Sequence, residues 1–268
     1  MTIQEWLDEN NQLGIDIWNK KYRFNNESFD EWLNRVSGKD VNLRQLILDQ
    51  KFLFGGRTLA NRDTGKKGSF SNCYSIGYVP DNLDSILDTA HKIGMTFKAQ
   101  GGQGLSLSKI RPKNSDINGQ FKSDGIIPFM EIFNTVTSSI SQGGSRKGAL
   151  MMSLDIWHKE AEQFITIKSK EGKIEKANLS LEIDDEFMRC VEEDFENKTE
   201  TSKQITREYD GGRVVYEVYP IRLYKKMMET VYDWGEPGCI FTTRFRNYNM
   251  MQYCDNYEIE TCNPCGQF

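Results

Sequence analysis

From about residue 51 onward, short stretches with strand-like alternation are separated by longer stretches with helical periodicity. The stretch "SNCYSIGYV" at 71–79 predicts a strand, "NLDSILDTAHKIGMTF" at 82–97 predicts a helix, and "GLSLSKI" at 104–110 predicts a second strand. Apolar residues recur every three or four positions in the helical stretch and every second position in the last strand. Strands that alternate with amphipathic helices are typical of an α/β architecture, so the sequence predicts an α/β fold for this part of the chain.

The pattern continues toward the C-terminus, whereas the first 50 residues differ. Further helices are predicted at 128–141 and 219–234, and further strands at 177–183 and 238–245. Residues 1 to about 50 are helical in pattern and contain three tryptophans, and Ser28 is a good N-cap for the helix that follows it. The sequence therefore predicts an N-terminal helical region at 1–50, followed by an α/β region at 51–268.

Composition and charge exclude several classes of function. The chain has 34 basic and 39 acidic side chains and no long basic run, so a nucleic-acid-binding surface is not indicated. No apolar run approaches the roughly 18 residues that a membrane span needs, and the N-terminus lacks the features of a signal peptide. We therefore expect a cytoplasmic protein with mostly reduced thiols, and a local site for a small anion remains open.

Four of the six cysteines fall within the last 30 residues, and two of them form a Cys-Asn-Pro-Cys motif at 262–265. Spacing alone permits half of a zinc site, a thioredoxin-like redox pair, or two buried thiols. A structural zinc site needs four ligands, and the chain has only two histidines and no second CxxC motif. A redox pair needs its first cysteine at a helix N-terminus, whereas this pair follows a predicted strand. Spacing alone therefore favours buried thiols.

Two glycine clusters, "AQGGQGLSL" at 99–107 and "SQGGSRKGA" at 141–149, allow the backbone to approach another group closely. Neither cluster matches a phosphate-binding P-loop or a dinucleotide-binding fingerprint, so tight turns explain them equally well. Arg111 and Lys113 follow a predicted strand, where the two cations could bind a phosphate or simply be solvated.

Taken together, five segments resemble the large, catalytic subunit of ribonucleotide reductase, in that family's order. They are "SNCYS", "PDNLDSI", "GGQGLSLSKIRP", "GIIPFMEIFNTVTSSISQGGSRKGALM" and "EIETCNPCG". The Asn-Pro-Cys-Gly sequence of the last segment resembles the cobalamin-dependent class II branch. The resemblance implies a ten-stranded α/β barrel built from two five-stranded halves. This chain would supply the N-terminal helices, the first half-barrel, and the finger loop that carries the radical cysteine.

The resemblance also implies roles for individual residues. Cys265 would carry the thiyl radical, Cys73 would be one partner of the reducing dithiol, and Asn263 would bind the ribose. Gln267 stands where the family has a glutamate that helps to deprotonate the 3′-hydroxyl, and a carboxamide cannot act as that base. The residues expected to line the substrate pocket are Thr58, Asn72 and Gly102.

An allosteric effector site is implied next to the first strand. The residues expected to bind the effector, a deoxynucleoside triphosphate or ATP, are Asp81, Asn82, Leu83, Arg111 and Lys113. Some family members have a further arginine where this chain has Asn118, so Lys113 would compensate for it. The charged segment at 168–178 would be a flexible loop that links the effector to substrate choice.

The resemblance implies a ribonucleoside-diphosphate reductase that uses adenosylcobalamin, is reduced by thioredoxin or glutaredoxin, and has no protein metal site. Because the chain ends just after the radical cysteine, we expect it to need a complementary C-terminal chain, and it would form a homodimer. Two alternatives are a catalytically inactive module that binds effector, and a class I large subunit that receives its radical from a separate subunit.

Overall fold

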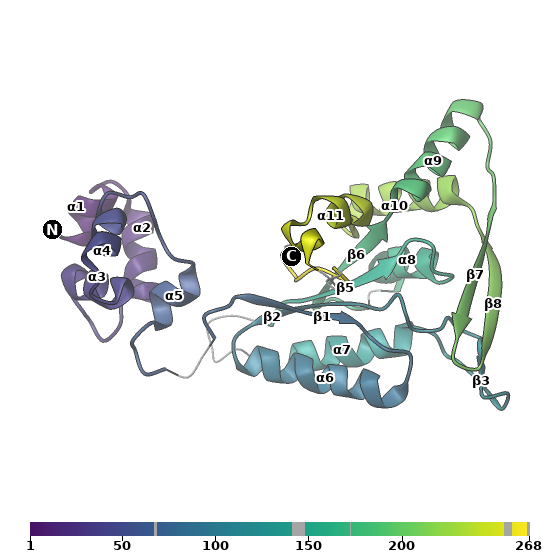
Figure 1. Ribbon diagram of the computed structural model, residues 1–268, viewed down its shortest axis with the longest axis horizontal. Coiled ribbons are helices and arrows are strands. Elements are labelled where there is room, and N and C mark those ends of the chain that lie inside the picture. Colours follow the sequence, from purple (N-terminus) through teal and green to yellow (C-terminus); the bar gives the residue numbers. More distant parts are fainter. Residues whose placement is uncertain (67–68, 141–147, 172, 255–258, 267–268) are drawn as a thin grey trace. The chain divides into compact units, whose positions relative to one another are not determined.

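The computed structural model describes residues 1–66, 69–140, 148–171, 173–254 and 259–266. It consists of two compact units, Met1–Asn72 and Cys73–Phe268, each of which has its own hydrophobic core (Figure 1). The α/β fold predicted from the sequence is confirmed, since the second unit is built on a parallel sheet with helices between its strands. None of the helices in the described ranges is long and apolar enough to cross a membrane.

The N-terminal unit, Met1–Asn72, is helical. Its helices are α1 (Ile3–Leu7), α2 (Gln12–Ile17), a π-helical turn (Trp18–Tyr22), α3 (Phe29–Ser37), α4 (Val41–Leu48) and α5 (Gly56–Asn61). Ser28 caps α3 through a reciprocal pair of hydrogen bonds with Glu31, which confirms the predicted N-cap. Trp6, Trp18 and Trp32 pack around Phe29 with ring centroids 5.4–6.3 Å from it. This aromatic cluster explains why three tryptophans occur in so short a segment.

The second unit contains a five-stranded parallel sheet in the order β1-β2-β5-β6-β9. Its strands are β1 (Cys73–Tyr78), β2 (Gly102–Ser106), β5 (Leu150–Asp155), β6 (Ala177–Ile183) and β9 (Gly238–Phe241). Because the strands are parallel, their amino ends meet at one edge of the sheet and their carboxyl ends at the other. Two short antiparallel pairs lie outside this sheet, β3 (Asp116–Ile117) with β4 (Phe121–Lys122) and β7 (Lys203–Tyr209) with β8 (Gly212–Val218).

Helices connect the strands of the sheet. They are α6 (Leu83–Lys98), α7 (Ile127–Ser139), α8 (Ala161–Glu171), α9 (Asp185–Asn197) and α10 (Pro220–Trp234). Helix α11 (Thr242–Tyr248) and a 3₁₀ turn (Met250–Tyr253) follow β9. Helices α6 and α7 lie side by side (Figure 1) and cover β2 and β5. Alternate residues of a strand point to opposite faces, so Leu105 of β2 joins the core while Gly102 and Gly104 face the other side.

Most of the predicted elements are present, and several boundaries are wrong. The helices predicted at 82–97, 128–141 and 219–234 and the strand predicted at 177–183 are confirmed as α6, α7, α10 and β6. The strand predicted at 104–110 is β2, which starts at Gly102 and ends at Ser106. All its residues are buried, so the alternation of leucine and serine did not show where the strand begins and ends. The strand predicted at 238–245 ends at Phe241, where α11 begins.

The segment at 168–178 was predicted to be a flexible loop, and this is wrong for much of its length. Residues 168–171 complete α8, and Ala177 and Asn178 already belong to β6. Ile174 is buried in the core, and Lys176 N donates a hydrogen bond of 2.9 Å to Asn134 Oδ1 on α7. The short connection at 173–176 is therefore held against α7 through its apolar side chain and its backbone.

Candidate functional site

The C-terminal segment at 259–266 lies along β1 and β2 on the face of the sheet opposite to α6 and α7. It runs antiparallel to these strands, since Glu260 contacts Gly77 at the end of β1 while Pro264 contacts Gly102 at the start of β2. Halfway along, the backbone of Cys262 and Asn263 lies directly over Gly104. Three glycines, which have no Cβ, therefore let the backbone of the C-terminal segment lie directly on the strands. We call residues 259–266 the finger segment.

The tip of the finger segment brings two of the predicted catalytic residues together. Cys73 Sγ, at the start of β1, and Cys265 Sγ are 3.4 Å apart, although 192 positions separate them in the sequence. The Cys73 side chain is half-buried and that of Cys265 is exposed. All six cysteines lie within the described residues, and no disulfide joins any of them. The site therefore presents two adjacent thiols, one of which is accessible from outside.

A tight turn presents Cys265. Asn263 Oδ1 accepts a hydrogen bond of 2.9 Å from Cys265 N, and Asn263 O accepts one of 2.9 Å from Gly266 N. Gly266 has a φ of +70°, which a residue with a Cβ rarely adopts. Pro264 packs over Gly102, where an added Cβ would lie 2.9 Å from Pro264 Cγ. Asn263 and Gly102 thus shape the tip, and their predicted contacts with substrate stay predictions.

Cys262, the first cysteine of the CxxC motif, has a different environment. Its side chain is buried in a small cluster with Met151 and Ile240. Burial, together with the nearby Glu182 carboxyl, raises the pKa of the Cys262 thiol to about 11. This thiol stays protonated at neutral pH and is a poor nucleophile. Within the described residues, no group of three or more His, Cys, Asp or Glu side chains is placed to hold a metal ion.

Replacing Gly104 with alanine is expected to displace the finger segment. The added Cβ would overlap the carbonyl oxygen of Cys262 and lie 2.9–3.0 Å from Asn263 Cα and C. Such overpacking costs about 1–3 kcal/mol of folding free energy, or forces the segment away from β2. Chemical denaturation and oxidative cross-linking of Cys73 to Cys265 would measure both effects. Gly55→Ala is the control, because its Cβ would meet only Asn72 Nδ2 at 3.9 Å. Unchanged cross-linking in Gly104→Ala would contradict the close approach.

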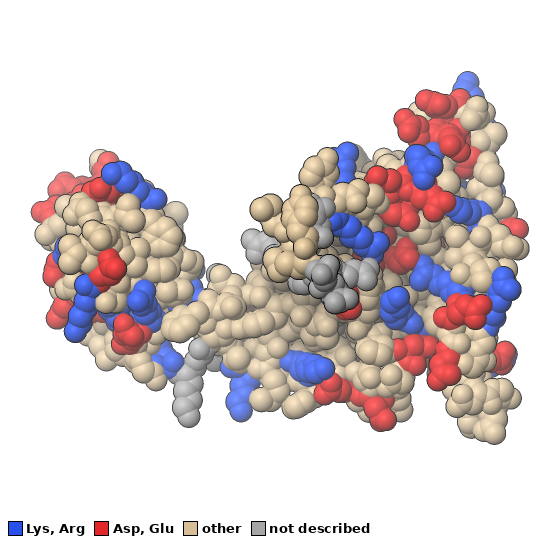
Figure 2. Space-filling view, in the orientation of Figure 1, with Lys and Arg blue, Asp and Glu red and all other residues tan. Residues whose placement is uncertain are grey.

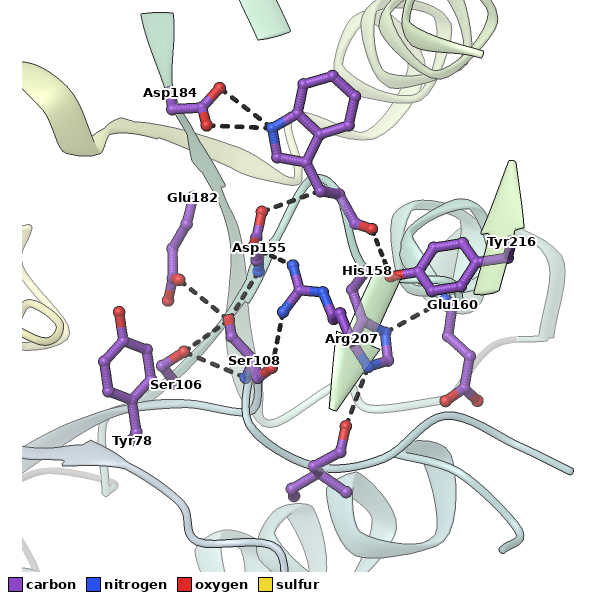
Figure 3. Close-up of polar contacts among 12 residues, drawn as sticks. Tyr78, Ser106, Ser108, Asp155, His158, Glu160, Glu182, Asp184, Arg207 and Tyr216 are labelled. Carbon is purple, nitrogen blue, oxygen red and sulfur yellow. Dashed lines mark hydrogen bonds and ion pairs between the residues drawn. The ribbon is translucent and has the colours of Figure 1, made fainter. Parts of the chain in front are cut away.

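A buried polar network lies toward the carboxyl ends of the central strands (Figure 3). Glu182 of β6 accepts hydrogen bonds from Ser153 Oγ at 2.6 Å and Ser108 Oγ at 3.0 Å. Burial raises the pKa of the Glu182 carboxyl, and these hydroxyls oppose the shift only in part. Ser153 Oγ also lies 3.2 Å from Thr261 Oγ1, so the network reaches the finger segment.

A polar pocket of about 120 Å³ opens beside this network. The residues that line it are Tyr78, Ser108, Lys109, Asp155, Glu182, Asp184, Arg207, Thr242 and Arg246. Figure 2 shows basic side chains on this face of the molecule, beside α11 and the β7–β8 hairpin. Arg207 of β7 forms an ion pair with Asp155 and donates a hydrogen bond to Ser108 O at 3.3 Å. The hairpin is thereby tied to the carboxyl edge of the sheet.

The residues predicted to bind the effector lie where β1 continues into α6 and where β2 continues toward β3. Arg111 is buried, and its Nε donates to Asp81 Oδ2 at 2.7 Å while its Nη1 donates to Asp116 O at 2.8 Å. Asn82 caps α6 by accepting a hydrogen bond from Ser85 N, and Leu83 is exposed. The structure brings Asp81 and Arg111 together as an ion pair, and the binding of effector by this group stays a prediction.

Two buried titratable residues hold the segment that carries Arg111 and Lys113. Glu160 Oε2 accepts hydrogen bonds of 3.2 Å from Lys113 N and Ile126 N, and burial raises the pKa of this carboxyl. His158 Nε2 lies 3.0 Å from Ile110 O, which can only accept, so this nitrogen carries the proton. Burial lowers the pKa of His158 to about 4.

The buried His158 predicts a loss of stability in mild acid. The pKa of this histidine is near 6.5 in the unfolded chain and about 4 in the folded one, because the folded state keeps the ring neutral. Its contribution to the free energy of unfolding is therefore complete above pH 6.5 and is lost as the pH falls toward 4. The loss amounts to roughly 2 kcal/mol between pH 8 and pH 5. The free energy of unfolding should be measured in urea at both pH values. Its decrease from pH 8 to pH 5 should be smaller by that amount in His158→Gln than in the unaltered chain. Glu160 and Glu182, whose pKa values are raised, change stability in the opposite direction, but they do so equally in both proteins. The difference between the two proteins therefore measures the contribution of His158. Equal decreases in both would contradict this prediction.

The remaining predicted residues are Thr58, Asn72 and Gln267. Thr58 is in α5 and Asn72 ends the N-terminal unit, and their role in substrate binding stays a prediction. Gln267 lies outside the described residues. The sequence analysis did not identify Glu260 or Glu182 as part of the site. Glu182 could have been noticed as an acidic residue within the apolar strand "ANLSLEI", whereas nothing local distinguishes Glu260.

Comparison with known proteins places this geometry in a family. Residues 71–267 match the family model described as "Ribonucleotide reductase, barrel domain". A vitamin B12-dependent ribonucleoside-diphosphate reductase of Thermoplasma acidophilum is 27% identical over 250 residues, which cover 90% of this chain and 31% of that protein. A vitamin B12-dependent ribonucleotide reductase of Streptomyces avermitilis is also 27% identical, over 95% of this chain and 28% of that protein.

Two further comparisons concern proteins that are not named for vitamin B12. The ribonucleoside-diphosphate reductase large subunit of Variola virus is 32% identical over 58% of this chain and 21% of that protein. The class Id ribonucleotide reductase alpha subunit of Actinobacillus ureae has the same fold, with a TM-score of 0.71 and 18% identity over 99% of this chain and 46% of that one. The chain thus spans between about a fifth and a third of the length of the curated relatives reported above. The family match covers most of the chain, and the chain belongs to the ribonucleotide reductase barrel-domain family.

Proposed function

We propose that this chain provides the radical-carrying half of a reductase that converts ribonucleoside diphosphates to deoxyribonucleotides. The observation that carries the proposal is the contact between the exposed Cys265 thiol and Cys73, whose sulfur atoms are 3.4 Å apart. Two thiols at one point provide a sulfur that can abstract hydrogen and one member of the dithiol that supplies the electrons. The names of the B12-dependent relatives and the family match support the same conclusion.

The proposed chemistry assigns a separate role to each thiol. A thiyl radical at Cys265 takes the 3′-hydrogen of the ribose, so that the neighbouring 2′-hydroxyl can accept a proton from the reducing dithiol and leave as water. Two electrons then come from a dithiol that ends as a disulfide, and Cys73 is one member of that dithiol. Its partner would lie in the complementary C-terminal chain, and thioredoxin or glutaredoxin would restore the dithiol. Once the ribose has been reduced, Cys265 returns the hydrogen to C3′ and becomes a thiyl radical again. The buried Cys262 takes no part, because its thiol is protonated and inaccessible.

Adenosylcobalamin is the radical source that we propose, since several relatives are named as vitamin B12-dependent. When bound, this cofactor supplies an organic radical through homolysis of its cobalt–carbon bond. The fit to this chain rests on Cys265, whose exposed side chain can be reached by a radical donor. The turn formed by Asn263 and Gly266 holds the Cys265 backbone in place for that encounter.

We further propose that the region around Asp81 and Arg111 binds a nucleotide effector at the start of α6. Helix α6 exposes three large apolar side chains, Leu83, Leu87 and Met95, which lie at or close to helical spacing. An exposed apolar stripe of this kind is typical of a helix that packs against another subunit. It supports the predicted homodimer, in which the effector site would lie near the subunit interface.

A catalytically inactive, effector-binding module is the second candidate. Gln267 favours it, because the family glutamate at this position acts as a base that a carboxamide cannot replace. The chain should be assayed alone and together with a complementary C-terminal half-barrel, with ribonucleoside diphosphate, a dithiol reductant and adenosylcobalamin. We expect deoxyribonucleotide only from the combination. Full turnover by the chain alone would overturn the need for a complement. Effector binding without turnover in either case would establish the inactive module, and turnover that needs a metal-containing subunit instead of cobalamin would establish the class I alternative.

A further inference from the structure

Glu260 attaches the finger segment to β1. Its Oε2 accepts a hydrogen bond of 3.1 Å from Tyr78 N, at the last residue of the strand. The carboxylate lies directly over Gly77, whose φ is +88° and where an added Cβ would overlap Oε2. A residue with a Cβ at position 77 would therefore exclude the carboxylate from its hydrogen-bond donor.

The donor is available because β1 contains a bulge. Ser75 pairs with Gly104 and Tyr78 with Ser106, so three steps along β1 correspond to two steps along β2. A bulge of this kind leaves a backbone group unpaired in the ladder. The next residue, Val79, resumes pairing by donating to Ser106 O at 2.9 Å. The Tyr78 N–H, next to this irregularity, donates to Glu260 Oε2 of the finger segment.

This contact fixes the register of the finger segment. The segment meets β1 at two points, Glu260 over Gly77 and Cys265 beside Cys73. A shift of one residue along an extended strand moves the side chains by about 3.3 Å and reverses the direction in which they point. A shift of that size would separate the two sulfur atoms. The hydrogen bond between Thr261 and Ser153 adds a second attachment next to the first.

We propose that Glu260 is a positioning residue that sets the register of the finger segment and thereby holds Cys265 against Cys73. The importance of this contact for catalysis rests on the function proposed above. The contact itself can be measured through thiol chemistry alone, because the equilibrium between the two thiols and a disulfide reports how closely they are held.

The test uses the whole chain in glutathione redox buffers. Cys73 and Cys265 together pass two electrons and two protons to glutathione disulfide, which yields two glutathiones and one protein disulfide. Acid quenching and peptide mass mapping measure the fraction of the Cys73–Cys265 disulfide at each ratio. We expect Glu260→Ala to lower the equilibrium constant about tenfold, which raises the reduction potential by about 30 mV. Glu260→Gln keeps an uncharged acceptor and should lower the constant about threefold.

Glu208→Ala is the matched control, because Glu208 is an exposed glutamate on β7 and its removal should leave the equilibrium unchanged. The thermal unfolding midpoint of each variant verifies that it is folded. An unchanged equilibrium in Glu260→Ala would overturn the proposal, and so would the absence of a Cys73–Cys265 disulfide in the unaltered chain at every redox ratio. A lack of reductase activity would count against the proposed function and leave this measurement unaffected.

Discussion

Cys265→Ala is expected to abolish deoxyribonucleotide formation by the complemented enzyme while leaving the fold intact. The side chain is exposed at the tip of a turn that is held by backbone hydrogen bonds and by Asn263, so its removal opens no buried cavity. Removal of a residue that forms the reactive centre costs on the order of 10⁴–10⁶ in turnover in other enzymes. The measurement is the rate of product formation under saturating substrate, compared with the unaltered chain.

Cys262→Ala is the control for this experiment. It removes a cysteine three residues away that belongs to the same motif, but its thiol is buried and its pKa is raised to about 11. We expect Cys262→Ala to retain turnover within about tenfold and to show a lower free energy of unfolding, because a buried group is lost. Retained turnover in Cys265→Ala, or loss of turnover in Cys262→Ala alone, would show that the wrong cysteine has been assigned.

Gln267→Glu is expected to raise turnover by about 10²–10⁴-fold, the usual contribution of a positioned general base. The substitution restores the carboxylate that the family resemblance places two residues after the radical cysteine. A carboxylate can accept the proton of the 3′-hydroxyl as the hydrogen is abstracted, whereas the carboxamide of Gln267 can only form hydrogen bonds. The rate should also acquire a pH dependence in which activity rises as the new carboxyl ionises.

The control is Gln163→Glu, which makes the same chemical change at an exposed position on α8. It changes the net charge by the same amount and should leave the rate unaltered. A gain with Gln267→Glu from a low starting rate would show that the machinery around Cys265 is otherwise complete. No gain, together with effector binding, would favour the inactive module and place the defect elsewhere in the chain.

Local patterns predicted the elements that have one polar face. Helices α6, α7 and α10 each combine apolar residues at helical spacing with a polar face or a clear end signal, such as Gly235 after α10. Strand β5 was not predicted, because all but its last residue is buried and its sequence, "LMMSLD", shows no regular alternation. The β7–β8 hairpin was also not predicted, although its Asp210–Gly211 turn is a typical hairpin signal.

The residues of the site show the same difference between what sequence patterns predict and what the structure adds. The family resemblance selected Cys73 and Cys265 from five ordered motifs, and the structure places their sulfur atoms in contact. Spacing within the CxxC motif gave no such result, since the cysteine three residues away is buried in a separate cluster. The family resemblance predicted that Arg111 binds the effector, and only the structure shows that its guanidinium donates to the Asp81 carboxylate and to the backbone oxygen of Asp116. Partners of this kind cannot be recognised from one stretch of sequence.

The sequence by itself determined the α/β architecture and the helical character of the N-terminal residues, and it singled out the C-terminal segment that carries Cys265. These follow from local periodicity and ordered motifs, which depend on which side chains must leave water. Only the tertiary structure decided which thiol faces which, because that depends on close approach between distant backbones. Glycines at positions 77, 102 and 104 clear the surface on which the finger segment lies, and Glu260 fixes its register. The absence of a Cβ has a consequence only when another chain segment occupies the space, and the fold alone specifies that segment.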